Sequence, residues 1–305
     1  MRNDGVTFSI ARHAYWAPGL TTLAAWTQWA QAPVAAPIIL GEEPGVKAMP
    51  PMLRRRAGFF GKMALEVAYE CLDGRTDVPV VFCSRHGEVA RAVELLSDLA
   101  RGEPLSPTAF SMSVHNAHVG LLTIARKDRA NHIALAAGGA TIEHAVIEAC
   151  GLLADGAASV LLVACDAPLP ELFLPFRDGV EQAHAWAWLL TAPVVEPAAG
   201  DPAAGDPAAG EPAAGAPAAG APAVGYPAAG ASAADASVAC APAACASVTL
   251  RWSASADAAS VDLPGGLAVA RFLLGGAAAM ERCDGRLRWH WALGNGGAGV
   301  NAAGA

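Results

Sequence analysis

The 305 residues carry a formal net charge of −8, and 54% of them are hydrophobic. This apolar fraction suffices for a sizeable buried core, in one large domain or two small ones. The acidic balance argues against non-specific nucleic-acid binding, which depends on clustered lysines and arginines, so we expect no nucleic-acid partner.

The amino terminus, Met1 to His13, lacks the continuous apolar stretch of a secretory signal, because Arg2, Asp4 and Arg12 interrupt it. No other stretch of the chain reaches the roughly 18 apolar residues, unbroken by charge, that suggest a membrane span. We therefore expect a protein of the cytoplasm without a membrane span.

A basic cluster follows at Arg54, Arg55 and Arg56. Three adjacent arginines are typical of a solvated helix start, but they also suit contact with an acidic protein. Both interpretations stay open at this point.

Elements then alternate as in an α/β layered fold. Val78–Phe82 is a short apolar run rich in valine, which predicts a strand buried on both faces. A helix should begin near Glu88 and end at Gly102, because its apolar residues recur at helical spacing up to that glycine.

A second series of elements follows. Ser113–Ala125 predicts a helix, Ile133–Ala136 a strand, the next residues a small-residue turn and a helix ending at Gly156, and Val160–Ala164 another buried strand. Strand, turn, helix and strand over about thirty residues match the length of one right-handed βαβ unit.

A five-residue repeat of the form xPAAG runs from Glu196 to about Gly230. Proline removes backbone donors and glycine adds chain entropy, so neither helix nor sheet propagates there. We expect residues 196–247 to be an extended, partly polyproline-II linker between a lobe at 1–195 and carboxy-terminal elements at 248–305. Those elements should pack back on the lobe and end in a disordered tail.

After the linker, Val248–Trp252 reads as a strand, Gly265–Leu274 as a helix and Arg286–Leu293 as an edge or terminal strand. Tryptophans recur at a spacing of two, at positions 186, 188, 289 and 291. This spacing favours paired strands with buried aromatic faces.

The turn after the 133–136 strand has the form of an elbow on which many acyl-transfer enzymes mount a nucleophile. At such an elbow the dipole of the following helix lowers the pKa of a thiol. Here the elbow consists of Ala137, Gly138 and Gly139, and none of these side chains can attack a carbonyl.

Several ordered segments resemble the amino-terminal half of β-ketoacyl synthases, and especially the short group found as chain-length factors in aryl polyene and related clusters. They are Pro51–Cys71, Phe110–Ala125, Ala136–Thr141, Gly156–Pro168 and Asp178–Trp188. The resemblance covers most of residues 6–192 and, weakly, 248–293. It implies a thiolase-like layered α/β fold, essentially one lobe of a synthase.

Carried over to this chain, the resemblance implies loss of catalysis. The cysteine that takes the acyl chain in synthases falls at about Gly138 or Gly139, and the histidine pair of the family's second half is not found. The implied role is a non-catalytic chain-length factor, without a cofactor, that forms a heterodimer with an active β-ketoacyl synthase. Acyl carrier protein is the second implied partner, and the arginine cluster is a candidate contact for it.

The resemblance also implies which residues line the partner's acyl tunnel. Candidates are Ser113, His115, Asn116 and His118, with His115 and Asn116 nearest the interface. A bulky side chain at the tunnel end would exclude the next two-carbon unit and so set chain length. His115 and Asn116 are equally explained as a capping pair at a helix start.

Two other functions remain open. Cys83, His86 and Glu88 follow a buried strand and have the order of a nucleophile, a base and an orienting group, as in a thioesterase or acyltransferase. A cysteine at the end of a strand is, however, more often a small buried hydrophobe. The third reading is a carrier-protein docking scaffold without influence on chain length.

Metal binding is not expected. His132 and His144 flank the elbow without a third ligand at metal spacing, and the seven cysteines include no CxxC pair. The odd cysteine count also argues against a disulfide framework.

Overall fold

The computed structural model describes residues 5–32, 42–177, 179–193, 246–260 and 262–294. Almost all of the expected linker and the expected disordered tail lie outside these residues. The described elements, in chain order, are β1 (Gly5–Trp16), α1 (Leu23–Gln31), α2 (Pro51–Arg54), α3 (Gly58–Leu72), β2 (Val80–Cys83), α4 (Val89–Arg101), α5 (Pro107–Ser111), α6 (Ala117–Arg126), β3 (His132–Leu135), η1 (Gly138–Ala140), α7 (Thr141–Ala154), β4 (Val160–Asp166), η2 (Glu171–Phe176), β5 (His184–Thr191), β6 (Ala246–Ala254), α8 (Gly265–Gly275), β7 (Ala279–Cys283) and β8 (Leu287–Leu293).

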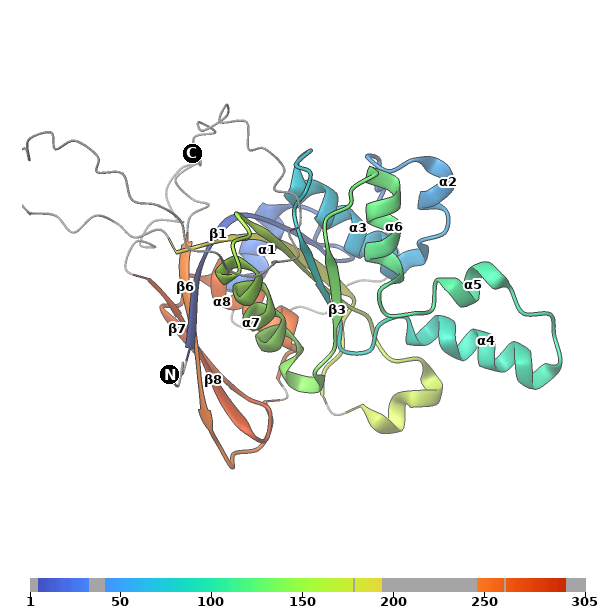
Figure 1. The fold of residues 1–305 in the computed structure, drawn as a ribbon. Helices are drawn as coiled ribbons and strands as arrows, with labels where there is room; N and C mark the ends of the chain where they lie inside the picture. The colour runs from blue at the N-terminus through green and yellow to red at the C-terminus, as the bar shows by residue number, and fades with distance from the viewer. Residues whose placement is uncertain (1–4, 33–41, 178, 194–245, 261, 295–305) are drawn as a thin grey trace, which may run out of the picture. The chain divides into compact units, whose positions relative to one another are not determined.

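One mixed sheet of eight strands organises these elements, in the order β3-β2-β4-β5-β1-β6-β8-β7 (Figure 1). β2 pairs in parallel with β3 on one side and β4 on the other. The remaining neighbours are antiparallel. The expected series β3, α7, β4 is present, and it crosses over β2, which lies between the two strands.

Helices cover both faces of the sheet. The side chains of β5 show how the packing on one face differs from the packing on the other. Trp186 and Trp188 point into the core cluster formed with α1, α7 and α8, whereas Ala185 and Ala187 point into the cluster formed with α3 and α6. Successive side chains of a strand alternate between faces, so large residues fill one layer and small residues admit helix α3 closely on the other. The fold is therefore a helix, sheet, helix arrangement of the α/β class, as the sequence predicts.

The carboxy-terminal strands are part of this same sheet. β6 pairs with β1 from Gly5 opposite Arg251 to Ile10 opposite Ala246, and β8 and β7 extend the sheet beyond it. β6 begins at Ala246, just before the expected end of the linker at 247. The strand expected at 286–293 as an edge or terminal strand is β8, the last described strand in chain order, but it is not the edge of the sheet, because β7 lies outside it.

The four spaced tryptophans are all buried, in one core cluster. Their strands are not paired, since β1 and β6 lie between β5 and β8. Trp186 and Trp188 stack with their ring centroids 4.0 Å apart. The aromatic pattern thus marks one face of a continuous sheet and not a hairpin.

The predicted helix at 113–125 is shorter than expected. It begins at Ala117, with Asn116 at its N-cap, because residues 107–111 form the separate short helix α5, which is capped by the Ser106 hydroxyl accepting from Ala109 N–H. Val119 and Leu122 face the core, as their spacing predicts.

Helix α4 has an amphipathic sequence, yet none of its residues is buried. Leu96 and Leu99 are each 61% exposed. In Figure 1, α4 and α5 extend to one side of the sheet, beyond α6. Among the described residues, no helix is both long and apolar enough to cross a membrane.

Candidate functional site

The elbow between β3 and α7 forms as the sequence predicts. Gly138 has a φ of +58°, a left-handed conformation that favours glycine, and open space surrounds the position of a side chain there. Thr141 fixes the turn, since its hydroxyl donates to Gly138 O at 2.8 Å and accepts from Ala137 N at 2.9 Å. The hydroxyl nearest to the elbow is therefore committed to the backbone.

The ends of β2 and β4 lie beside this elbow, and Asp166 joins them. Its Oδ1 accepts from the Ser84 hydroxyl at 2.9 Å and from the Arg85 N–H at 2.8 Å. The Ser84 hydroxyl in turn accepts from Gly87 N at 2.8 Å. This network holds the 84–87 loop at the carboxyl end of the parallel strands, where α/β folds commonly build their sites.

Cys83 is fully buried in the core at the end of β2. Burial, together with the nearby Asp166 and Glu143 carboxylates, raises the pKa of its thiol well above the ordinary range. A nucleophilic cysteine needs access and a lowered pKa. The environment of Cys83 is that of a small core residue.

The structure does not bring the set Cys83, His86 and Glu88 together. Among the described residues, no hydrogen bond joins Cys83 to His86. His86 Nε2 lies 3.9 Å from Oε1 of Glu181, and Glu88 Oε1 lies 3.1 Å from His118 Nε2. The two carboxylates thus serve two different histidines.

The four residues expected to line a partner's tunnel fall into different environments. Ser113 is half-buried and donates to Phe110 O, and His115 is half-buried with its Nε2 3.1 Å from Leu135 O. Asn116 is exposed, and its side chain makes no cap hydrogen bond.

His118 departs from the expectation that it lines the tunnel. It is only 1% exposed and contacts Ala57 O as well as Glu88. Its ring occupies the space that a side chain at Gly61 would need. Because it faces inward, it contributes to the core and not to a surface.

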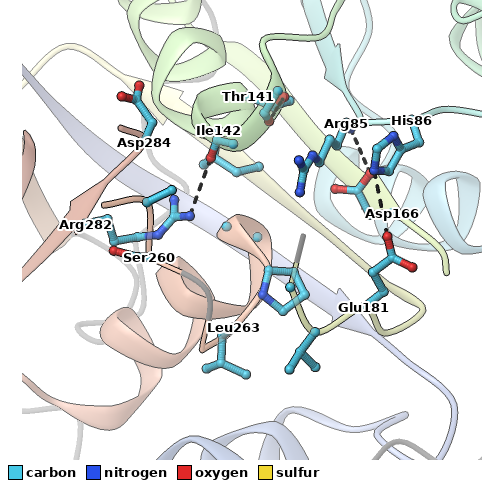
Figure 2. A pocket seen from close by; sticks show the side chains of 18 of the residues that line it. Arg85, His86, Thr141, Ile142, Asp166, Glu181, Ser260, Leu263, Arg282 and Asp284 are labelled. Atoms are coloured by element: carbon cyan, nitrogen blue, oxygen red, sulfur yellow. Dashed lines mark hydrogen bonds and ion pairs between the residues drawn. The ribbon is translucent and has the colours of Figure 1, made fainter. Parts of the chain in front are cut away.

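A pocket of about 380 Å³ lies over the elbow (Figure 2). Its lining comes from the 84–87 loop, the elbow with the start of α7, the end of β4 at 166–167, segment 179–182, and the carboxy-terminal residues 258–260, 263–266 and 282–284. Figure 2 shows Arg282 and His86 on opposite sides of this pocket. The elbow is therefore covered by the carboxy-terminal part of the same chain.

A buried ion pair joins this carboxy-terminal part to the elbow helix. Arg282 Nη1 donates to Glu143 Oε1 at 2.7 Å, and its Nη2 lies 3.5 Å from Gly139 O. Glu143 is fully buried in the first turn of α7, where the helix dipole favours a negative charge. The second oxygen of Glu143 has no hydrogen-bond partner within the described part of the chain.

Sequence reasoning missed the roles of Glu143, Glu181 and Arg282. Glu143 carries a usable signal, since an acidic residue in the first turn of an otherwise apolar helix is typical of a group with a specific partner. Arg282 and Glu181 carry none, because each meets its partner across a long separation in the chain. In the described residues, no group of three or more histidine, cysteine or acidic side chains is arranged to hold a metal ion.

Several solved structures are similar to this chain. The structure of the ketosynthase (ApeO) in complex with its chain length factor (ApeC) from Xenorhabdus doucetiae matches with a TM-score of 0.69 and 23% identity, over 94% of this chain and 99% of that chain. The ishigamide ketosynthase/chain length factor matches at a TM-score of 0.49 with 15% identity, over 61% of this chain and 62% of that one. A type II polyketide synthase acyl-carrier protein in complex with its ketosynthase, AntDE:AntF, reaches 0.45 with 12% identity, over 61% and 63%.

At these identities the first match supports the fold, a thiolase-like lobe, and the two with TM-scores below 0.5 add no argument. Comparison with curated proteins gives no match. The sequence profile described as β-ketoacyl synthase, N-terminal domain, matches residues 26–216, which is more than half of the chain. The chain therefore belongs to the β-ketoacyl synthase N-terminal domain family.

Proposed function

We propose that this chain is a chain-length factor, a non-catalytic subunit that pairs with an active β-ketoacyl synthase in aryl polyene-type fatty acid or polyketide assembly. One observation carries the proposal: the elbow has the backbone geometry of a nucleophile mount but bears only Ala137, Gly138 and Gly139. Without a thiolate at this position, transfer of an acyl chain onto the protein and condensation from it have no residue to run them.

The open edge of the sheet supports pairing with another protein. β3 is at one end of the strand order, so its outer backbone groups have no neighbour among the described strands. Its four residues are only half-buried, whereas those of β2 are fully buried. An unprotected edge strand is a template for pairing with a second chain.

Apolar side chains gather on the elements next to this edge in the chain. The exposed large hydrophobic residues of segment 89–126 are Leu96, Leu99, Leu105, Phe110, Val114 and Ile124. Exposed apolar side chains on elements that contact one another, as α4 and α5 do, favour an interaction site. An amphipathic helix such as α4, none of whose residues is fully buried in the described part of the chain, is best explained by burial against a partner.

Chain length would be set by a side chain that projects from this face into the partner's acyl tunnel. Phe110 is a bulky candidate for this side chain, and it is 66% exposed. It comes shortly before Ser113, His115 and Asn116, which the family resemblance implies as tunnel-lining residues. A large side chain at the end of a tunnel excludes the next two-carbon unit sterically.

The proposal is tested by co-expression of the tagged chain with candidate β-ketoacyl synthases, followed by co-purification and analysis of product length. We expect a stable complex with one synthase, and longer products when Phe110→Ala replaces the wild type. Leu96→Glu should abolish co-purification, whereas Leu23→Glu, at an exposed apolar residue of α1, should not. Failure of every synthase to co-purify, or active condensation by the chain alone, contradicts the proposal.

A carrier-protein contact is favoured by a second observation. Lys47, Arg54, Arg55 and Lys62 line a surface hollow, in a chain whose net charge is −8. Arg54 is held there by Gly45 O and Val46 O, each 3.3 Å from its Nη1, and Lys62 pairs with Glu43 at 2.5 Å. A cationic hollow of this kind suits the acidic surface of an acyl carrier protein through complementary charge.

Carrier binding is tested with Arg55→Glu, measured by titration with acyl carrier protein at two salt concentrations. Rim charges act mainly on association rate and salt dependence, so we expect weaker binding and a smaller loss of affinity on adding salt. Arg286→Glu, at an exposed arginine between β7 and β8, is the control and should bind as the wild type. Equal losses of affinity in Arg55→Glu and Arg286→Glu would mean that overall charge, and not the hollow, determines binding of the carrier protein.

A further inference from the structure

The pocket over the elbow contains a histidine with a carboxylate behind it. His86 lines the pocket with its side chain 29% exposed, and its Nε2 faces Glu181 Oε1 at 3.9 Å (Figure 2). Glu181 is itself held in place, because its Oε2 accepts from Leu169 N–H at 2.9 Å. While Nε2 faces the carboxylate, the second ring nitrogen of His86 can accept a proton.

The Oε1 atom of Glu181 is not engaged by another group of the described residues. This atom is buried and lacks a hydrogen-bond partner among the described residues. A buried carboxylate oxygen without a partner is costly, and the nearest group that can relieve it is the His86 ring. The arrangement is that of a base and an orienting carboxylate, the two-group core of many acyl-transfer sites.

Gly138 and Gly139 also line the pocket, and their backbone N–H groups are candidate donors to a ligand. Gly138 and Gly139 begin the turn that leads into α7, and the first N–H groups of such a turn have no acceptor within the helix. Open space surrounds the missing side chain at Gly138, so a ligand can approach the backbone there. Donors of this kind stabilise the oxyanion that forms when a carbonyl is attacked.

Apolar side chains complete the pocket and set its substrate class. Ile142, Val180 and Leu263 line it, with small residues between them, and its volume of about 380 Å³ suits a ligand of modest size. The charged residues Arg85, Asp166, Arg282 and Asp284 also face it, and among these both Arg282 and Asp166 are engaged in contacts within the chain. A neutral, short acyl group fits such walls better than a free ion.

We propose that this pocket hydrolyses esters or thioesters of short acyl groups, with His86 as the general base and Glu181 as its positioning residue. His86 takes a proton from water as the water oxygen bonds to the acyl carbon. The tetrahedral oxyanion is held by the Gly138 and Gly139 N–H groups. The carbon–sulfur or carbon–oxygen bond then breaks, and His86 returns the proton to the leaving thiolate or alkoxide, giving one acid and one thiol or alcohol.

This reaction needs no group attached to the protein, so it is compatible with an elbow that has no nucleophile. It also uses His86 without Cys83, which the fold keeps in the core. The inference goes beyond the subunit role proposed above, which is non-catalytic with respect to acyl loading and condensation only, and does not depend on it. A subunit of this kind would release short or stalled acyl groups.

The test uses the purified full chain with two probes, butyryl-coenzyme A and p-nitrophenyl butyrate, and follows acid release by chromatography and nitrophenolate by absorbance. We expect hydrolysis above the buffer rate and a fall of roughly 100-fold in His86→Ala, the lower end of the usual contribution of a general base. Glu181→Gln should lower the rate less and change its pH profile, because Glu181 acts through His86.

Matched controls separate this site from general effects. His290→Ala removes a histidine of strand β8 that also pairs with a glutamate, Glu281 at 3.4 Å, but is 42% exposed and outside the pocket lining, and the variant should hydrolyse both probes as the wild type does. Cys83→Ala should also retain the activity. Ala259→Trp, which fills the pocket without changing His86, should abolish it.

The proposal is overturned if neither probe is hydrolysed above the buffer rate, or if His86→Ala or Ala259→Trp, folded by circular dichroism, hydrolyses them like the wild type. Hydrolysis of one probe only assigns the site to that class of leaving group. Co-purification of His86→Ala with a synthase is measured in parallel. Since that readout does not involve hydrolysis, failure of either proposal is recognised separately.

Discussion

His184 illustrates how a single buried residue ties stability to pH. It is fully buried at the start of β5, its Nδ1 lies 2.9 Å from Gln182 O, and its Nε2 packs against Gly266 without a hydrogen-bond partner. Burial lowers the pKa of this imidazole below its ordinary value of 6.5, more than the nearby Asp166 raises it. The folded state therefore binds its proton less readily than the unfolded chain.

The free energy of unfolding should fall with acidity as a result. The stabilisation is complete above pH 6.5 and is lost as the pH falls from there through the lowered pKa of the folded state, because only the unfolded chain gains the proton in that range. His184→Gln should flatten this part of the profile, measured by urea unfolding at several pH values. His13, whose pKa is also lowered by burial, leaves a residual slope. An unchanged profile in the variant would contradict the account.

The Arg282 and Glu143 pair makes a second prediction at the residue scale. Both side chains are buried, so removal of the arginine leaves an uncompensated carboxylate in the core. Arg282→Met should cost about 3–5 kcal/mol in the free energy of unfolding, and the double variant with Glu143→Leu should recover much of it. Equal destabilisation by the single and the double variant, in urea titrations, would mean that the charge itself is not the cause.

At the scale of elements, we expect the elbow and helix α7 to retain an environment that activates a nucleophile, so that only the nucleophilic side chain is missing. Gly139 has open space for a side chain, the nearest atom being Asp284 Cβ at 4.0 Å. Gly139→Cys should therefore fold and present a thiol at the amino terminus of α7, where the helix dipole lowers its pKa. Its alkylation by iodoacetamide at neutral pH should be faster than that of Gly151→Cys, near the other end of the same helix. Equal rates would indicate that the elbow is not an activating environment.

Some strands can be predicted from the sequence and others cannot. The strands β2, β3 and β4 are predictable, because short apolar runs between turn residues mark neighbouring parallel strands, of which β2 and β4 are buried and β3 is half-buried. β1 is not, since it carries Arg12 and His13, and an irregularity in its pairing between Ile10 and Arg12 breaks the period of two.

The site divides in the same way. The turn at 137–139 and the absence of a nucleophile there can be predicted from local sequence, because chain direction and residue size determine them. The partner of His86 cannot, since Glu181 comes from a distant loop that only the antiparallel pairing of β5 with β4 brings to the pocket. His118 was misplaced for a related reason, because its burial depends on the glycine at 61 in another helix.

For the whole molecule, the sheet order makes the carboxy-terminal strands necessary for folding. β6 covers the long strand β1, and Trp289 and Trp291 of β8 lie in the same core cluster as Trp186 and Trp188. A chain truncated after Pro193 should therefore lose cooperative unfolding, because it exposes an edge and part of a core at once. Circular dichroism melts of the truncated and full chains test this, and a truncated chain with the full-length melting temperature would contradict it.

The proposed subunit role requires that the chain cannot carry an acyl group at its elbow. Incubation of the purified chain with an acyl-carrier thioester, followed by intact-protein mass spectrometry, measures this directly. The account predicts an unchanged mass for the chain at all times, even if free acid is released. A stoichiometric, saturable acyl adduct on the chain would contradict it.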